Sequence, residues 1–203
     1  RAAGRAGLNN GGKPENPRAP SIVLPNPAAA VLTAGSTPSN GVLAIQADKL
    51  VLGEGAKAIQ GFSQVDIRAN ELIGRGSGST DIAAATANLN VARLSGELGA
   101  NQTLTTTGSL SVADTAADRA LAPVTALGAR WALSGTDLMF DTEAILPSGQ
   151  LQLTATFGNL TLGANAVASA AGRSVAFFDV ERASPGGTVE LASDNGNVVV
   201  QTG

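Results

Sequence analysis

Two pairs of carboxylates have a spacing that could support acid–base chemistry on sugars. Asp179 and Glu181 lie two residues apart in a strand-like stretch, and Asp137 and Asp141 flank a short apolar segment. Glycoside-cleaving enzymes hold two such groups about 5–10 Å apart. The chain has no His, Cys or Tyr, so carboxylates, lysines, arginines and hydroxyls are the reactive groups that remain. Polar residues that alternate along a solvated strand give the same pattern, and we favour that interpretation.

Several other motifs could indicate a binding or modification site, but each has a simpler structural explanation. Asp194-Asn195-Gly196-Asn197 has calcium-type ligands, but the glycine-rich nonapeptide of calcium β-rolls is missing, and an Asx/Gly corner explains it better. The glycosylation triplets at 101–103 and 159–161 arise easily in a Thr/Asn-rich chain. Residues 76–79 (GSGS) indicate a flexible corner, and Phe177-Phe178 indicates a core plug with one ring exposed. We therefore predict no catalytic residue, no cofactor and no metal ion.

Composition favours a β protein with many corners. Hydrophobic residues make up 43% of the chain and aromatics only 3%, which is typical of a narrow interior filled by small and branched aliphatics. Gly, Ser, Thr and Asn supply turns. A net charge of −3 without a basic stripe argues against nucleic-acid binding. No run approaches the ~20 apolar residues of a membrane span, and no signal peptide is recognisable.

One frame recurs along the chain: apolar-x-apolar-x-small-x-x-apolar-x-apolar. It is clearest from Leu43 to Leu52 and from Trp131 to Phe140, and its small residue, Ala47 or Gly135, suggests a bend between two short strands. The copies that begin at Ile82 and Val65 keep the same spacing, with Gly74 as the last residue of the second, and the remaining copies have one residue fewer or two more in the middle. The first positions of all copies are Leu43, Val65, Ile82, Leu104, Trp131, Leu151 and Val189.

These positions predict a stack of coils. Their average spacing is about 21 residues if the last interval, from 151 to 189, holds two coils. That length is too short for two strands and a helical crossover, which take ~30 residues, and suits one coil of short parallel strands. We expect an all-β parallel β-helix with the residues at 43, 82 and 131 in one column. An antiparallel sandwich of hairpins is the alternative, although the corners lack the favoured Asn-Gly and Asp-Gly pairs.

Three stretches depart from the frame. Residues 1–40 are rich in Pro and Gly and predict an extended lead-in, in which 21–24 and 30–32 could be edge strands. Residues 113–130 are Ala-rich and predict an inserted loop or short helix. Residues 163–187 should contain one further coil around Val175 and Phe177.

The β-helix as a whole is expected over 41–203. Because the chain starts without Met and stops directly after strand-like residues, we expect a piece of a longer protein.

The later part of the chain resembles a known family. Residues 41–56, 127–164 and 171–200 are similar to the C-terminal region of filamentous-haemagglutinin-family exported proteins. The more specific phrases are PSGQ at 147–150, FFDV at 177–180 and GGTV at 186–189. The resemblance covers roughly residues 41–203, and the N-terminal secretion module of that family is not recognisable.

The resemblance implies a right-handed β-helical fibre secreted to the bacterial cell surface. Its partners would be an outer-membrane two-partner-secretion transporter and a receptor or glycan on a host or neighbouring cell. On this basis we expect a structural shaft of an adhesin or exoprotein and no enzyme activity. A β-helical polysaccharide lyase or hydrolase and a glycan-binding adhesin module are the alternatives.

Overall fold

The computed structural model describes residues 19–24, 40–114 and 121–202. These residues form strands joined by corners and loops, and none of them is helical. The predicted all-β class is confirmed. The strands are β1 (Ala19–Leu24), β2 (Val42–Leu52), β3 (Gly55–Ile59), β4 (Gln64–Gly74), β5 (Ser77–Ile82), β6 (Thr86–Gly96), β7 (Asn101–Thr106), β8 (Ser109–Ala113), β9 (Arg130–Gly135), β10 (Leu138–Asp141), β11 (Glu143–Ile145), β12 (Gln150–Ala155), β13 (Leu160–Leu162), β14 (Val167–Ser169), β15 (Ser174–Phe177), β16 (Val180–Ala183), β17 (Thr188–Ser193) and β18 (Val198–Val200).

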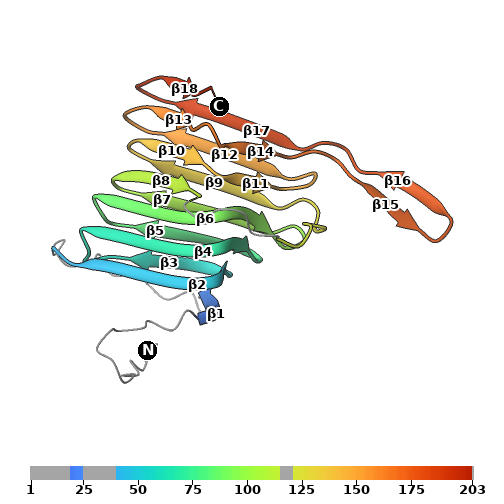
Figure 1. The fold of residues 1–203 in the computed structure, drawn as a ribbon, viewed down its shortest axis with the longest axis horizontal. Helices are drawn as coiled ribbons and strands as arrows, with labels where there is room; N and C mark the ends of the chain where they lie inside the picture. Colours follow the sequence, from blue (N-terminus) through green and yellow to red (C-terminus); the bar gives the residue numbers. More distant parts are fainter. Residues whose placement is uncertain (1–18, 25–39, 115–120, 203) are drawn as a thin grey trace.

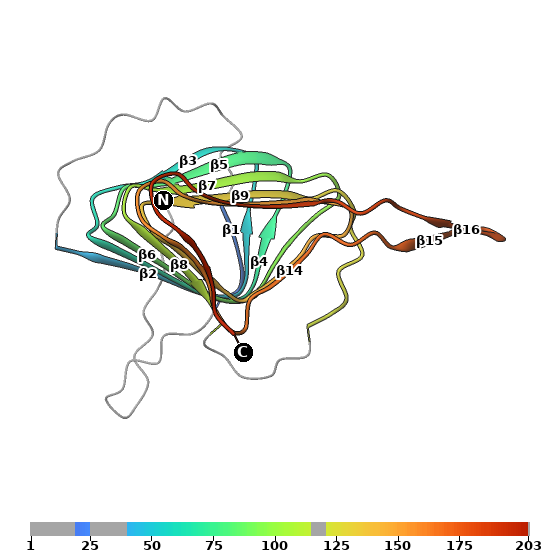
Figure 2. The same cartoon turned by 90° about the horizontal axis from the view of Figure 1, so that it is seen from above.

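Successive coils lie over one another and enclose a three-sided core (Figures 1 and 2). The first face holds the N-terminal halves of β2, β4 and β6, followed by β8, β10, β13 and β18. The second face holds β1, the C-terminal halves of β2, β4 and β6, then β11 and β14. The third face is the sheet β3-β5-β7-β9-β12-β17. Between β2 and β4 the register breaks at Ala47 and Asp48, where the long strand turns from the first face to the second.

Every pair of neighbouring strands in these three faces is parallel. Parallel pairing requires the chain to travel around the core before it returns, so the faces build up one coil at a time. Among the described residues, β15 and β16 form the only antiparallel pair. The antiparallel sandwich is therefore wrong, and the stacked parallel arrangement is confirmed.

Aliphatic columns fill the interior, as the alternation predicts, but they connect different residues from those expected. Leu43 pairs with Val65, which pairs with Ala87. The column then continues through Leu110, Leu138, Leu160 and Val198. Ile82 and Trp131 belong instead to the third face. The predicted column through 43, 82 and 131 is wrong, because the same local pattern marks two different corners of the coil.

The two corners explain the error. In β2 and β4 the frame crosses from the first face to the second, whereas from β9 to β10 it crosses from the third face to the first. A small residue between two apolar pairs suits either bend. Trp131 is 1% exposed, so its predicted core position is confirmed, and its Nε1 donates to the Ser95 carbonyl over 2.8 Å.

The second face lacks a strand in one coil. On the first face β8 lies between β6 and β10, but on the second face β11 pairs directly with β6. After Ala113 the chain leaves the stack and returns at Arg130, within the predicted insertion at 113–130. Residues 115–120 lie outside the described residues. Residues 121–129, which we call the strap, form neither helix nor strand.

The expected further coil within 163–187 is wrong. After β14 the chain leaves the stack as the hairpin β15–β16, which projects sideways in both views (Figures 1 and 2). It returns at Gly187, whose N–H donates to the Ala170 carbonyl over 2.7 Å. Leu160 pairs directly with Val198, so the long last interval holds one coil and an inserted hairpin.

At the other end of the stack, β1 pairs with the C-terminal half of β2 and is the last strand of its sheet. The predicted edge strand at 21–24 is thereby confirmed. The second predicted edge strand, at 30–32, and most of the lead-in at 1–40 lie outside the described residues.

Candidate functional site

A column of charged residues follows the outer side of the second face. Lys49 pairs with Glu71, Glu71 with Arg93, and Arg93 with Glu143, so the sign of the charge alternates from strand to strand. Each of the first three precedes a buried leucine, and alternation along a strand points the two neighbours in opposite directions. The stacking thus places opposite charges one strand spacing apart.

Two members of this column are buried although they point away from the core. The side chains of Glu71 and Arg93 are 9% and 8% exposed. Arg93 Nη2 and Nε donate to Glu71 Oε1 over 2.7 and 3.2 Å, and Ser95 Oγ donates to the same oxygen over 3.0 Å. Lys49 Nζ lies 3.8 Å from Glu71 Oε2. Both charges therefore keep partners after water has been removed.

The strap is what covers them. Arg93 Nη2 also donates to the Ala122 carbonyl over 2.8 Å, and Arg173, at the base of the hairpin, donates to the Val124 carbonyl over 3.3 Å. Further along, the N–H of Gly99 donates to the Leu127 carbonyl. The strap is thus attached both to the second face and to the segment that leads into the hairpin.

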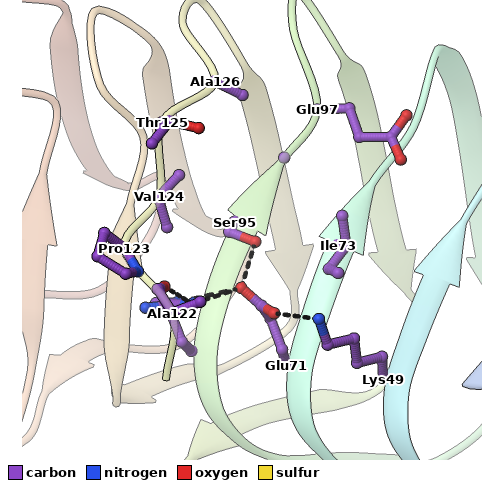
Figure 3. Close-up of a pocket in the computed structure, with 12 residues that line it drawn as sticks. Lys49, Glu71, Ile73, Ser95, Glu97, Ala122, Pro123, Val124, Thr125 and Ala126 are labelled. Atoms are coloured by element: carbon purple, nitrogen blue, oxygen red, sulfur yellow. Dashed lines mark hydrogen bonds and ion pairs between the residues drawn. The ribbon is translucent and has the colours of Figure 1, made fainter. Parts of the chain in front are cut away.

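Between the strap and the second face lies a depression of about 230 Å³ (Figure 3). Ile73, Pro123 and Val124 give it apolar walls, and Lys49 stands at its rim with its side chain 56% exposed. We call this the strap depression. Its other lining residues are Glu71, Arg93, Ser95, Gly96, Glu97, Ala122, Thr125 and Ala126.

The charges around the strap depression are already paired with one another. Glu71 is held by Arg93, Ser95 and Lys49 as described, and Glu97 Oε1 lies 2.6 Å from Arg75 Nη2. The hydrogen bond and the charge of Glu97 raise the pKa of the Arg75 guanidinium. Both carboxylates that line the strap depression thus have basic partners, an arrangement that suits binding.

A second basic group is held by the backbone. Lys57 Nζ donates to the carbonyls of Gly53 and Gly55, each over 2.7 Å. Partial burial lowers the pKa of this ammonium. Its bonds join the end of β2 to β3, which indicates a corner support.

The structure does not bring the carboxylates considered for catalysis to the strap depression. Asp179 lies in the turn between β15 and β16, and Glu181 lies on β16, both exposed. Asp137 precedes β10 and Asp141 ends it, which separates their backbones by ~13 Å. Each of the latter two accepts a backbone N–H of the next coil, from Asn159 and Asn165. Asp137 and Asp141 thus stabilise corners.

The calcium-type motif also lies at a corner. The N–H of Asn197 donates to Asn159 Oδ1, and Asn159 in turn donates its N–H to Asp137 Oδ1. Asn195 Nδ2 donates to the Thr156 carbonyl over 2.9 Å. These side chains connect successive coils. In the part of the chain that the structure describes, no group of three or more acidic residues is placed to hold a metal ion.

The remaining sequence motifs lie on strands or at corners. The first glycosylation triplet begins at Asn101, which is the first residue of β7. In the second triplet, the side chain of Asn159 accepts the corner hydrogen bond described above. Gly76 makes a left-handed corner with φ of 59°, but residues 77–79 belong to β5, so the predicted flexible corner is shorter than expected. Phe178 is fully exposed at 105%, which agrees with the expectation that one ring of the Phe177-Phe178 pair is exposed.

The charged column was missed by motif analysis. Its members are 22 residues apart in the sequence, from Lys49 to Glu71 to Arg93, so a search for charges that alternate in sign at the coil length could have found it. The strap could not have been placed that way, because no repeat relates it to the strands that it covers.

No family model, no curated protein and no solved structure matches this chain. Among the described residues, no helix has the length and apolar character needed to cross a bilayer.

Proposed function

We propose that this chain is a segment of the shaft of a secreted, filamentous-haemagglutinin-like bacterial adhesin or exoprotein. The shaft is a right-handed parallel β-helix of about 21 residues per coil, and it projects a binding or effector region from the cell surface. The full-length protein is exported by an outer-membrane two-partner-secretion transporter and meets a receptor or glycan on another cell.

One observation carries the proposal: the parallel ladder is continuous from β1 to β18 around a single apolar interior. In such a stack the backbone hydrogen bonds run along the stacking direction, and strand edges remain only at the two ends. Each coil buries its aliphatic side chains against the coils above and below. Burial of one such side chain stabilises the fold by about 1.5–3 kcal/mol. An architecture of this kind supports length and rigidity.

The segments that resemble the family contribute to the stack itself. Residues 41–56 contain β2, and 127–164 contain β9 to β13. Residues 171–200 contain the hairpin and the last coil. The proposal thus assigns the resemblance to elements that build the shaft and to the hairpin that branches from it.

Imaging and localisation test the proposal together. We expect the protein to form rods with strong β circular dichroism, a rise of ~4.8 Å per coil and a right-handed path in a high-resolution map. Antibodies against this chain should label intact cells of the source bacterium. Globular particles, a left-handed path or a purely intracellular signal would contradict it.

A polysaccharide lyase or hydrolase is the second candidate, because the strap depression combines Lys49, Glu71 and Arg93 on one face of a parallel solenoid. This candidate predicts turnover in a panel of acidic and neutral polysaccharides, lost in Glu71→Gln with the fold retained. The shaft predicts no turnover by either protein. A glycan array separates a third candidate, a glycan-binding adhesin module, from both.

A further inference from the structure

The turn of the hairpin places an aromatic ring where a glycine would be expected. Phe177 pairs with Val180, so Phe178 and Asp179 form a two-residue turn. Phe178 has φ of 52°, a left-handed conformation that L side chains rarely adopt, and is 105% exposed. In such turns glycine supplies this conformation without strain. A strained backbone that also exposes a phenyl ring points to a binding role for that ring.

The base of the hairpin is fixed to the stack. Ser148 Oγ and Ser184 Oγ lie 2.7 Å apart, and Ser184 Oγ donates to the Arg173 carbonyl over 3.0 Å. The guanidinium of Arg173 reaches the strap at Val124. These bonds hold the arm before any partner arrives, which lowers the ordering cost of binding.

Charge is distributed unevenly along the arm. The acidic residues, Asp179 and Glu181, lie at or near the tip, whereas the basic residues, Arg182 and Arg173, lie closer to the base. Within the described part of the chain, neither acidic residue forms an ion pair. A partner for the tip should therefore offer an apolar hollow with a basic group beside it.

The strap depression has these properties. Its volume of about 230 Å³ exceeds the ~150 Å³ of an apolar protein cavity that accepts benzene. Ile73, Pro123 and Val124 supply apolar contact, and Lys49 supplies a half-exposed cation at the rim, whose Nζ lies 3.8 Å from Glu71 Oε2 and keeps a side exposed to a second carboxylate. The acidic neighbour Glu97 is neutralised by Arg75.

We propose that the tip of the hairpin in one copy of this chain docks into the strap depression of a second copy. The phenyl ring of Phe178 enters between the strap and the second face, and Asp179 approaches Lys49. The hairpin extends away from its own stack in both views, so its tip is presented to another molecule (Figures 1 and 2). If a twofold axis relates the copies, two reciprocal contacts close a dimer.

This contact goes beyond the shaft function, because it associates shafts side by side. A bilayer is the poorer partner, because the carboxylate of Asp179 would enter it together with the ring. A glycan is also a poorer partner, since the tip is a convex turn, whereas sugar-sized ligands bind in concave sites.

Sedimentation velocity of the full chain over a range of concentrations tests the docking. We expect self-association that weakens in high salt, because the charged pair is screened. Phe178→Gly should weaken it by about tenfold or more, as expected for an aromatic anchor. This variant relieves the strained turn, so the hairpin should remain folded. Phe157→Ser is the matched control, because Phe157 is 75% exposed at the corner between β12 and β13, a different corner from the one that carries the hairpin, and it should leave self-association unchanged.

Charge exchange identifies the two surfaces. Asp179→Lys and Lys49→Glu should each weaken self-association, and mixing the two variants should restore a heterodimer through the opposite pairing. Circular dichroism and rod length should match the wild-type protein in every variant, so failure of docking stays distinct from failure of the shaft.

Four results would overturn the proposal. One is a monomer at all concentrations, and another is unchanged association in Phe178→Gly. A third is association that is lost only in Val198→Lys, which places a charge at the exposed last strand and blocks end-to-end stacking. The fourth is Phe178-dependent binding to phosphatidylcholine vesicles or to a glycan array by a protein that does not self-associate.

Discussion

Two ion pairs join neighbouring coils across the same 22-residue interval but have different surroundings; one links β4 to β6, and the other links the residues that directly follow these two strands. Glu71 and Arg93 are buried beneath the strap, whereas Arg75 and Glu97 have side chains 48% and 46% exposed. Burial makes the first pair costly to break, because either charge left alone would remain out of water. Solvent screens the second pair and makes it nearly dispensable.

Arg93→Met should therefore lower the free energy of unfolding by about 3 kcal/mol, since it removes the closest basic partner of a buried carboxylate and leaves Glu71 with the Ser95 hydroxyl and the more distant Lys49. The same change should free the strap at Ala122 and speed its cleavage by proteases. Urea unfolding and limited proteolysis measure the two effects. Arg75→Met is the control and should change neither result beyond experimental error. Equal effects of the two substitutions would show that burial does not distinguish the pairs.

Neighbouring glycines at the return of the hairpin offer a second residue-scale comparison. A Cβ added to Gly187 would overlap the backbone carbonyl of Gly149, whereas at Gly186 the nearest atoms lie 3.9 and 4.0 Å away. Gly187→Ala should reduce the free energy of unfolding by about 1–3 kcal/mol, as overpacking does. Gly186→Ala should be almost neutral. Thermal unfolding of both variants checks the close approach of the two coils at this point.

At the scale of elements, the sequence predicted strands and bends well but not the assignment of bends to corners. The alternation of Leu43 and Ile45 with polar residues fixes which side faces the core, and Ala47 marks a bend. Nothing in such a short pattern says which corner of a coil it forms, so Ile82 was placed in the wrong column. The hairpin was also missed, because β15 and β16 have the same strand-like composition as a coil and its insertion brings the interval close to two coils.

The hairpin should be removable without loss of the stack. Because the Gly187 N–H donates to the Ala170 carbonyl, deletion of residues 173–186 leaves Ala170-Ala171-Gly172-Gly187, which has the length of a β-turn closed by that bond. We expect cooperative unfolding with a midpoint near that of the wild-type protein, measured in urea by circular dichroism. A molten or aggregated product would mean that the arm is part of the folding core.

At the scale of the whole molecule, parallel stacking was predictable from the sequence because it depends on period and composition. The strap depression was not, because it needs a loop to pack against strands distant in the sequence, as Ala122 does on Arg93. Phe178 shows a related limit: one exposed ring was expected in the Phe177-Phe178 pair, but apolar character alone does not say that this ring lies in a hairpin turn.

Deletion of a whole coil tests the solenoid directly. Removal of residues 64–85 joins Ser63 to Thr86, which occupies the place of Gln64 in the register. The product should fold, unfold cooperatively at lower denaturant and be ~4.8 Å shorter in solution scattering. Removal of β4 alone shifts the faces against one another and should abolish folding. If both deletions behaved alike, coils would not be the units of the fold.

The direct pairing of β11 with β6 has a mechanical consequence. Between these coils the first face spans two strand spacings, through β8, while the second face spans one. A stack that has one strand fewer on one face is shorter on that face and must tilt toward it. The axis along which the coils stack should therefore change direction beneath the strap. A fibre built from this chain would be bent at that point.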